Sequence, residues 1–221
     1  NYNNLLPLKR LDTLRIAALS IGENADFFQE MLSNYAPIEY FNISENASTI
    51  DKAVLLNKLS KYNLVIASIH KSNVSPWESF EIKKDVDILL QSIALQNKVI
   101  VSIFANPYSI NSLLFTNNFD VMLLSYQNSE QAQNQTAQVI FGGIAVNGRI
   151  PVSTKHFEIN SGLTTNHIRM NYVNSEEINL NSDWFYKIDS IVKNAIDKRA
   201  TPGCQILIAK DGHIFFNKSY G

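Results

Sequence analysis

The sequence of 221 residues has a single cysteine, Cys204, so it cannot form a disulfide within one chain. Its four histidines are scattered, and no His or Cys residues stand at the spacing of a zinc site. Glycine-rich motifs that hold phosphate groups, such as G-x-G-x-x-G and G-x-x-x-x-G-K-[ST], are missing as well. The sequence therefore predicts a protein without a metal and without a cofactor.

Long apolar runs and an excess of one charge are also missing. The longest apolar runs, residues 64–69 and 99–104, are far too short to cross a bilayer, so we expect no membrane span. The net charge is −1 and both signs are interspersed, which argues against nucleic acid as a partner. A hydrophobic share of 45% and a charged share of 18% are those of a globular protein with a buried core.

Short apolar runs alternate with helical periodicity from Arg15 to about Gln127, which is the pattern of repeated βα units. The runs are apolar nearly throughout, as strands covered by helices on both faces are. The expected strands are residues 15–22, 38–43, 64–69, 98–104 and 120–125. The predicted fold class is α/β, a three-layer sandwich with a mainly parallel sheet of five or six strands flanked by helices.

Four helices are expected between and after these strands. The first two have the apolar faces Phe28, Met31, Leu32 and Tyr35, and Ile50, Val54, Leu55 and Leu59. A third helix has a start signal in Ser75, Pro76 and Glu78, and its buried side is Ile82, Val86, Leu89, Leu90 and Ile93. The fourth, residues 129–141, runs into two glycines that can end it.

The last third of the chain has a different organisation. Residues 155–181 show no sustained period and are predicted to be a linker between a domain of residues 1–154 and a piece of residues 182–221. That piece begins with an amphipathic helix, whose apolar face holds Trp184, Phe185, Ile188, Ile191, Val192, Ala195 and Ile196. A hairpin comes next, turning at Asp211-Gly212. Cys204 lies in its first strand and is expected to be buried.

The segment F-G-G-I-A-V-N-G-R-I-P-V, residues 141–152, resembles the closing segment of the C-terminal α/β domain of glycoside hydrolase family 3. In many members the loop before the last helix carries a catalytic glutamic acid. Here Gln127 can align with the family's glutamine, but Asn128 comes directly after it and is not an acid. Glu130 is instead expected to lie in the first helical turn, where the helix dipole favours a negative charge. The sequence therefore predicts no catalytic residue here.

In lacking a catalytic acid here, the chain is similar to the bacterial β-N-acetylglucosaminidases of family 3. Those enzymes carry both the nucleophile and the acid/base dyad on the barrel. The resemblance implies a noncatalytic accessory domain of a larger hydrolase that cleaves β-linked N-acetylglucosamine. It also implies two partners within the parent chain, a catalytic barrel before this domain and another domain after it. The resemblance also implies that the parent lies in the periplasm or cell envelope; this segment itself has no readable targeting signal.

The end of the chain, with Pro202-Gly203 followed by the A-K-D-G hairpin, resembles the opening of a serine β-lactamase-like or penicillin-binding-protein domain. The nucleophile of that family would come after residue 221. The two S-x-x-K matches here, at Ser68 and Ser190, lack the family's surroundings and are interpreted as chance. The apolar faces of residues 182–221 are expected to fold back on the α/β domain or to pair between chains.

A binding surface is possible where the parallel strands end, since open α/β sheets place ligands at the carboxyl ends of their strands. The candidate ligand-binding residues are Glu23, Asn24, His70, Lys71, Asn106 and Gln127. Two interpretations stay open at this point. These residues either border a site, as in an independent flavodoxin-like module that binds a small ligand, or are polar groups that end strands at solvent.

Overall fold

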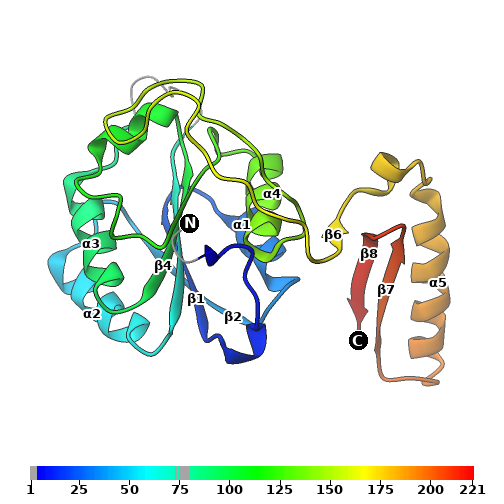
Figure 1. Ribbon diagram of the computed structural model, residues 1–221. Helices are drawn as coiled ribbons and strands as arrows, with labels where there is room; N and C mark the ends of the chain where they lie inside the picture. Colours follow the sequence, from blue (N-terminus) through cyan, green and yellow to red (C-terminus); the bar gives the residue numbers. More distant parts are fainter. Residues whose placement is uncertain (1–3, 73, 75–79) are drawn as a thin grey trace. The chain divides into compact units, whose positions relative to one another are not determined.

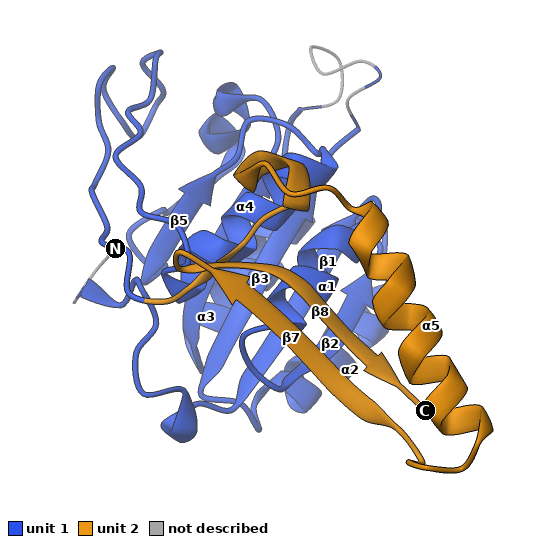
Figure 2. Ribbon diagram, turned by 90° about the vertical axis from the view of Figure 1, so that its right-hand side faces the viewer, with its two compact units in different colours: residues 1–168 blue, residues 169–221 orange. Residues whose placement is uncertain are grey.

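The computed structural model describes residues 4–72, 74 and 80–221. It divides into two compact units, Asn1–Ile168 and Arg169–Gly221, which are coloured blue and orange in Figure 2. The division lies inside the segment 155–181 that the sequence predicts to be a linker. Each unit is described by itself.

The first unit is built on a sheet of five parallel strands (Figure 1). The strands are β1 (Ile16–Gly22), β2 (Ile38–Ile43), β3 (Leu64–His70), β4 (Lys98–Phe104) and β5 (Val121–Leu124). They lie in the order β2-β1-β3-β4-β5, and each pairs with its neighbours in parallel. All seven residues of the central strand β3 are buried. The α/β class and the parallel sheet predicted from the apolar runs are confirmed.

Helices cover both faces of this sheet (Figure 1). They are α1 (Asp26–Ser33), α2 (Thr49–Leu59), α3 (Lys84–Ala94) and α4 (Glu130–Phe141). Because side chains alternate along a strand, the sheet divides the buried residues into two cores. One core joins Leu19, Ala67 and Val101 to α2 and α3. The other joins Ala18 and Ile66 to α1 and α4.

The expected apolar face of α2 is wrong in part. Leu55 and Leu59 are buried, whereas Ile50 is 76% exposed and Val54 is 51% exposed. At about 100° per residue, Ile50 lies about 140° around the helix from Leu55 and Val54 about 100° from it. The buried stripe of α2 is therefore narrower than its apolar composition indicates.

The start of the third helix differs from its predicted signal. The helix α3 begins at Lys84, and Lys83 precedes it in an extended conformation. The proposed capping residues Ser75, Pro76 and Glu78 lie outside the described residues. Four of the predicted core residues, Val86, Leu89, Leu90 and Ile93, are buried within α3, while Ile82 is buried ahead of it.

The segment after α4 has no helix or strand up to residue 168, yet its backbone is bonded back to the first unit. Gly142 ends α4 in the left-handed conformation, with φ of 76°. Ile168 N donates to the carbonyl oxygen of Gly142 at 2.8 Å, and Ile150 N donates to that of Ser161 at 2.9 Å. This part of the expected linker is consequently a bonded loop of the first unit.

The second unit contains a small three-stranded sheet and one long helix, drawn in orange in Figure 2. The helix is α5 (Asp183–Asp197), and the strands β6 (Asn171–Tyr172), β7 (Cys204–Lys210) and β8 (His213–Tyr220) lie in the order β6-β8-β7. Asp211 and Gly212 join β7 to β8 with φ of 52° and 85°. These positive angles confirm the tight hairpin turn predicted from the Asp-Gly pair.

One face of the hairpin packs on α5. The ring centroids of Phe185 and Phe216 are 4.9 Å apart, and the Asp189 carboxylate accepts from Lys218 Nζ at 2.8 Å and from Tyr220 Oη at 2.6 Å. Val192 is buried in the same unit, on α5. The helix and the hairpin therefore share a small core of their own.

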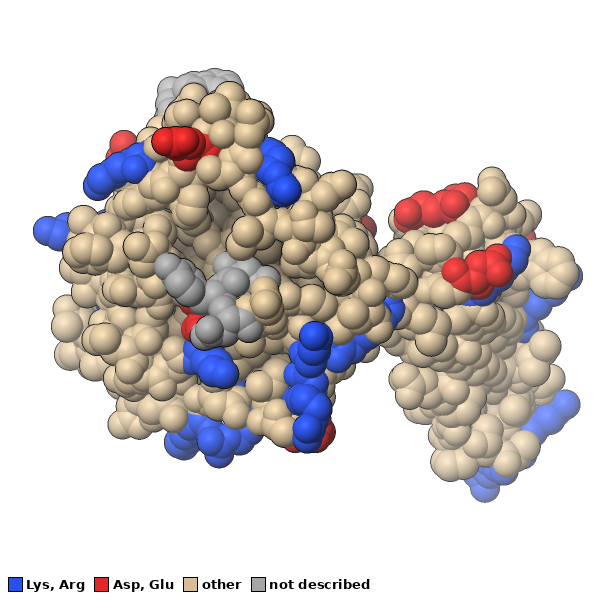
Figure 3. All heavy atoms as spheres, viewed as in Figure 1, with Lys and Arg blue, Asp and Glu red and all other residues tan. Residues whose placement is uncertain are grey.

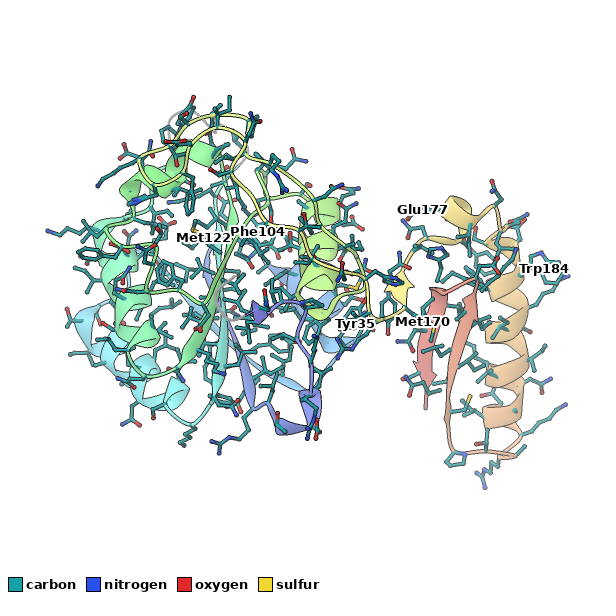
Figure 4. All side chains as sticks on the ribbon, viewed as in Figure 1. Tyr35, Phe104, Met122, Met170, Glu177 and Trp184 are labelled. Atoms are coloured by element: carbon teal, nitrogen blue, oxygen red, sulfur yellow. The ribbon has the colours of Figure 1, made fainter. Side chains whose placement is uncertain are left out.

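The predicted apolar face of α5 is only partly covered. Trp184 is 68% exposed and Ile191 is 70% exposed, and Figure 4 shows Trp184 on the side of α5 away from the strands. Cys204 is exposed too, so its expected burial is wrong. It is the first residue of β7, which pairs with β8 alone among the strands of the described residues. Among the described residues, no helix combines the length and the apolar character needed to span a membrane.

A close approach of two strands at the end of β1 generates a prediction. Gly22 has φ of 100°, and a Cβ atom there would press against the carbonyl oxygen of His70. We expect Gly22→Ala to lower the free energy of unfolding by more than about 2 kcal/mol, because the clash and the backbone strain add. Gly148→Ala is the matched control, since its Cβ would meet nothing within 4 Å. Urea unfolding of both variants measures the difference; equal stabilities would contradict the steric argument.

Candidate functional site

The candidate site is the edge of the sheet where β1 and β3 end side by side. Gly22 of β1 pairs in register with His70 of β3. The chain leaves β1 for β2 on one side, while β3 and the later strands lie on the other, so the strand order reverses between β1 and β3. Such a reversal is where open α/β sheets place ligands. Four of the six candidate residues predicted from the sequence follow or end these two strands.

His70 is the last residue of β3, and it is buried completely. Its ring stacks on Phe104, with centroids 4.5 Å apart and planes inclined by 13°, and meets the ring of Phe28 at 6.0 Å. Figure 4 labels Phe104 in the interior of the first unit. Burial among these rings lowers the pKa of His70 to about 4, while its hydrogen bond with Asn128 acts in the opposite direction. His70 is therefore a neutral imidazole at pH 7.

Two amide side chains fix the orientation of this imidazole. Nδ1 of His70 lies 2.9 Å from Oδ1 of Asn128, and Nε2 of Gln133 donates to the same oxygen at 2.7 Å. With that amide orientation His70 Nδ1 is the donor, and Nε2 is left as a buried acceptor. Among the described residues, Nε2 has no hydrogen-bond partner.

Gln133 extends this network to the start of α1. Its Nε2 also donates to the carbonyl oxygen of Asn24 at 3.1 Å, and its Oε1 accepts from the backbone N–H of Phe28 at 3.0 Å. Gln133 is buried, so its amide needs these protein partners in place of water. The network thus ties the end of β3, the start of α1 and the start of α4 together.

Lys71 forms an ion pair beside this network. Its Nζ lies 2.6 Å from Oε1 of Glu45, and the two side chains are 10% and 16% exposed. A second cation, Lys83, stands 3.9 Å from the other carboxylate oxygen of Glu45. The pair neutralises two charges that would be costly to bury alone. The ammonium group of Lys71 is therefore paired with a carboxylate of the same unit.

The remaining candidate residues have local roles. Glu23 is exposed, and its backbone N–H donates to the carbonyl oxygen of His70. The Asn24 side chain accepts from the backbone N–H of Asp26 at the start of α1. Asn106 caps the 3₁₀ turn Pro107–Ser112. Gln127 is exposed, with its amide 3.2 Å from the Ser129 hydroxyl. Asn24 is thus brought to the His70 network, whereas Asn106 and Gln127 are not bonded to it.

Three residues of this site, Glu45, Asn128 and Gln133, were not predicted as site residues from the sequence. Glu45 comes shortly after β2 at the same edge of the sheet, so the strand-end rule that selected Lys71 could have found it. Asn128 directly follows Gln127 in the sequence, and no pattern there indicates that its amide bonds His70. Gln133 lies within α4, and no sequence pattern distinguishes a buried glutamine of a helix from an exposed one.

The arrangement provides no activated nucleophile among the described residues. The Ser68 hydroxyl is buried and lies 3.3 Å from the carbonyl oxygen of Leu19, while Lys71 is paired with Glu45. Ser190 is exposed on α5. Glu130 is exposed in the first turn of α4, as predicted from the helix dipole. No group of three or more His, Cys, Asp or Glu side chains in the described part could hold a metal ion.

The visible surface agrees with the balanced composition. Figure 3 shows charged side chains singly or in small groups among uncharged residues, without a broad field of one sign on that face. A hollow of about 590 Å³ is lined by Phe80, Ile82, Tyr108 and Leu114 with polar neighbours, after the ends of β3 and β4.

The sequence matches no family model and no curated protein. The fold is similar to that of a fungal multi-domain GH3 β-N-acetylglucosaminidase with a GCN5-related glucosamine N-acetyltransferase region. The TM-score is 0.54 at 20% identity, over 74% of this chain and 18% of that one. A GH3 exo-β-xylosidase, solved with a xylobiose aziridine probe, gives a TM-score of 0.52 at 12% identity over 67% and 22%.

A GH3 β-N-acetylglucosaminidase from Paenibacillus sp. aligns at a TM-score of 0.48 and 18% identity, over 61% of this chain and 26% of that one. The chain therefore spans about a quarter or less of the length of these solved structures. At such identities the likeness concerns the fold. It places the α/β architecture described above among architectures found in GH3 proteins.

The buried imidazole generates a prediction about pH. Above its ordinary pKa of 6.5, His70 is neutral in both states; between 6.5 and about 4 the unfolded chain binds a proton that the folded chain does not. The free energy of unfolding should consequently fall by about 3 kcal/mol from this group as the pH falls from 6.5 to 4. Urea unfolding at several pH values should show a flatter dependence for His70→Asn, whose amide can still donate to Asn128.

The exposed His167 offers the matched control, and His167→Asn should keep the pH dependence of the unchanged protein. Carboxylates also titrate in this range, but their contribution to the pH dependence of the free energy of unfolding is common to the three proteins. A slope that is the same in His70→Asn and in the unchanged protein would refute the assignment.

Proposed function

We propose that the first unit is a noncatalytic α/β domain of a larger glycoside hydrolase. In this proposal the parent cleaves β-linked N-acetylglucosamine on a separate catalytic barrel, and this domain packs on the barrel and positions the next domain. The observation that carries the proposal is the burial and internal bonding of side chains at the ends of the strands. His70 and Lys71, two ionisable side chains at this edge, are buried and bonded to Asn128 and Glu45.

A domain whose function is support needs a rigid strand edge more than a reactive one. The His70 network joins three elements, and the Lys71–Glu45 pair joins the ends of β2 and β3, so the loops at this edge are held by bonds inside the protein. The likeness in fold to the GH3 enzymes supports the same role. That a catalytic barrel precedes this unit in the parent protein is also part of the proposal.

The second unit has its own place in this proposal. We infer that α5 and the β7–β8 hairpin are the opening of a β-lactamase-like domain, as the Pro-Gly pair and the A-K-D-G turn suggest. The compact packing of α5 on the hairpin supports an origin separate from the sheet of the first unit. A periplasmic or cell-envelope location for the parent belongs to the same proposal.

The direct test is hydrolysis of 4-nitrophenyl N-acetyl-β-glucosaminide and of a chromogenic β-lactam. We expect this chain alone to hydrolyse neither, because His70, Lys71 and the Ser68 hydroxyl are buried and bonded within the protein. When the barrel of the parent is added, we expect turnover of the glycoside by the barrel, and a higher thermal stability of the barrel in the presence of this chain.

Turnover of either compound by this chain alone would overturn the proposal. In that case Glu130→Gln and His70→Asn are the first variants to compare. Loss of turnover in one variant and not the other would identify the group, since Glu130 is exposed and His70 is buried in a separate network.

A second candidate function is a flavodoxin-like module that binds a small ligand. The specific observation in its favour is the strand order β2-β1-β3-β4-β5, which is the flavodoxin-like order with its reversal between β1 and β3. The buried, unpartnered Nε2 of His70 stands at that reversal. In this reading a ligand would approach the exposed Gly22 and Glu23.

Thermal unfolding in the presence of N-acetylglucosamine separates the two functions. The binding module predicts a saturable rise of the midpoint, equivalent to about 2.7 kcal/mol at a hundredfold excess over Kd, which Glu23→Gln would reduce. The accessory domain predicts no saturable rise. Glu158→Gln, a change of another exposed acid in the first unit, is the control and should leave any rise unaltered.

A further inference from the structure

The sequence contains a single Asn-Gly pair, Asn147-Gly148, and it lies in the loop that follows α4. Both residues are exposed, and a Cβ atom at Gly148 would meet nothing within 4 Å. Among the described residues, neither the side-chain amide of Asn147 nor the backbone N–H of Gly148 has a hydrogen-bond partner. Because glycine has no side chain to hinder a close approach of its backbone, the two groups can react with each other.

Hydrogen bonds anchor the loop on either side of this pair. Before it, Thr165 N donates to the carbonyl oxygen of Val146 at 2.8 Å. After it, Ile150 N donates to the carbonyl oxygen of Ser161 at 2.9 Å. Residues 147–149, which we call the tip, lie between these two anchors. The fold therefore holds the ends of the tip while its own peptide groups stay accessible.

Arg149 directs its guanidinium group at the tip. Its Nη1 donates to the carbonyl oxygen of Gly148 at 3.1 Å and to that of Asn147 at 3.3 Å, and its Nη2 lies 3.5 Å from the hydroxyl oxygen of Thr164. In the described part of the chain, Arg149 forms no ion pair with a carboxylate. Its positive charge is consequently placed on two carbonyl oxygens of the tip.

The position of this charge matters because the carbonyl of Asn147 and the N–H of Gly148 belong to one peptide group. When the nitrogen of Gly148 loses its proton, the negative charge is shared with the carbonyl oxygen through the resonance of the peptide bond. A positive charge that is bonded to this oxygen stabilises the negative charge as it develops. Arg149 therefore favours the deprotonated nitrogen, which is the form that can attack a carbonyl carbon.

We propose that Asn147 is a site of self-modification, at which the side-chain amide is lost through a succinimide ring and Arg149 assists ring closure. The Gly148 nitrogen gives its proton to hydroxide and forms a bond to Cγ of Asn147. The bond from Cγ to Nδ2 breaks, and Nδ2 leaves as ammonia after taking a proton from water. Water then opens the ring at either carbonyl, which leaves aspartate or isoaspartate. The proposal is independent of the function proposed for the first unit.

The product would alter the tip in two ways. A carboxylate would replace a neutral amide beside the guanidinium group of Arg149, so the chain would carry one more negative charge. Isoaspartate would also add a methylene group to the main chain of the tip, whose two ends are held by Val146 and Ile150. The modification would therefore change both the charge and the backbone of this loop.

Peptide mapping by mass spectrometry tests the modification after incubation of the full chain at mildly alkaline pH. We expect the peptide that contains Asn147 to gain one dalton with time, and an isoaspartate methyltransferase to label it. A synthetic peptide of residues 144–151 shows the time that the unfolded segment needs. An unchanged mass at Asn147 after the synthetic peptide has reacted fully would overturn the proposal.

Gly148→Ala tests the route through the ring. Its Cβ meets nothing in the folded chain, so the variant should keep its fold, which far-ultraviolet circular dichroism checks. The same Cβ hinders the approach of the nitrogen to Cγ of Asn147, so the gain of mass should be slower. An equal rate in Gly148→Ala and in the unchanged chain would overturn ring closure as the route.

Arg149→Gln tests the assistance by the guanidinium group. We expect the rate constant for the gain of mass to fall about two- to fivefold, as suits an exposed charge interaction. Loss of the contacts of Arg149 would by itself loosen the tip and speed ring closure, so a slower reaction cannot result from a looser loop. An equal or faster rate in Arg149→Gln would overturn the role of Arg149.

Two controls separate the position of the charge from its presence. Arg199→Gln makes the same change at an exposed arginine of the second unit and should leave the rate as it is. In the synthetic peptide, Arg149→Gln should have a smaller effect than in the chain, because no folded loop holds the guanidinium group there. An equal fall in Arg199→Gln, or an equal fall in the peptide, would overturn the assignment to the folded tip.

Discussion

The pairing of β1 with β3 is the constraint on which the rest of the first unit depends. These two strands meet in the middle of the sheet, and at their ends Gly22 lies against the carbonyl oxygen of His70. Only a residue without a Cβ allows that approach, and its positive φ sends the chain away toward α1. The same point fixes His70 beneath the helices and brings Lys71 to Glu45. Sheet geometry and site geometry therefore have one origin.

The site shows how burial changes the meaning of polar residues at a strand end. A histidine and a lysine in such a place are the usual components of binding or acid–base chemistry. Here the imidazole is stacked on an aromatic ring and neutral, and the ammonium group is paired with a carboxylate. Their partners are side chains of the same domain, and this is the basis of the supporting role proposed for the edge.

Much of the fold could be predicted because its strands are buried on both faces and read as continuous apolar runs. The bounds of β2 and β4 match at both ends. Side-chain environment was harder to predict. Ile50 is apolar yet exposed, since a helix on the outer layer buries only a narrow stripe, and Cys204 is exposed at the start of β7, which pairs with β8 alone among the described strands. The strand-end rule also selects His70 and Lys71, and a binding site at this edge stays a prediction. The hydrogen-bond network that joins His70 to Asn128 and Gln133 could not be predicted, since these residues come from a loop and a helix far along the sequence.

The order of the strands also has a consequence for how the chain folds. The central sheet joins segments that are distant in sequence: the side chain of Asn63 bonds the backbone of Arg15 across a separation of 48 residues. The hairpin of the second unit, in contrast, turns on Asp211 and Gly212 alone. Closing the long loops costs chain entropy before the parallel strands can pair. The hairpin and α5 should therefore form early and the sheet late. During synthesis, the slow step would belong to the first unit, which emerges before the second.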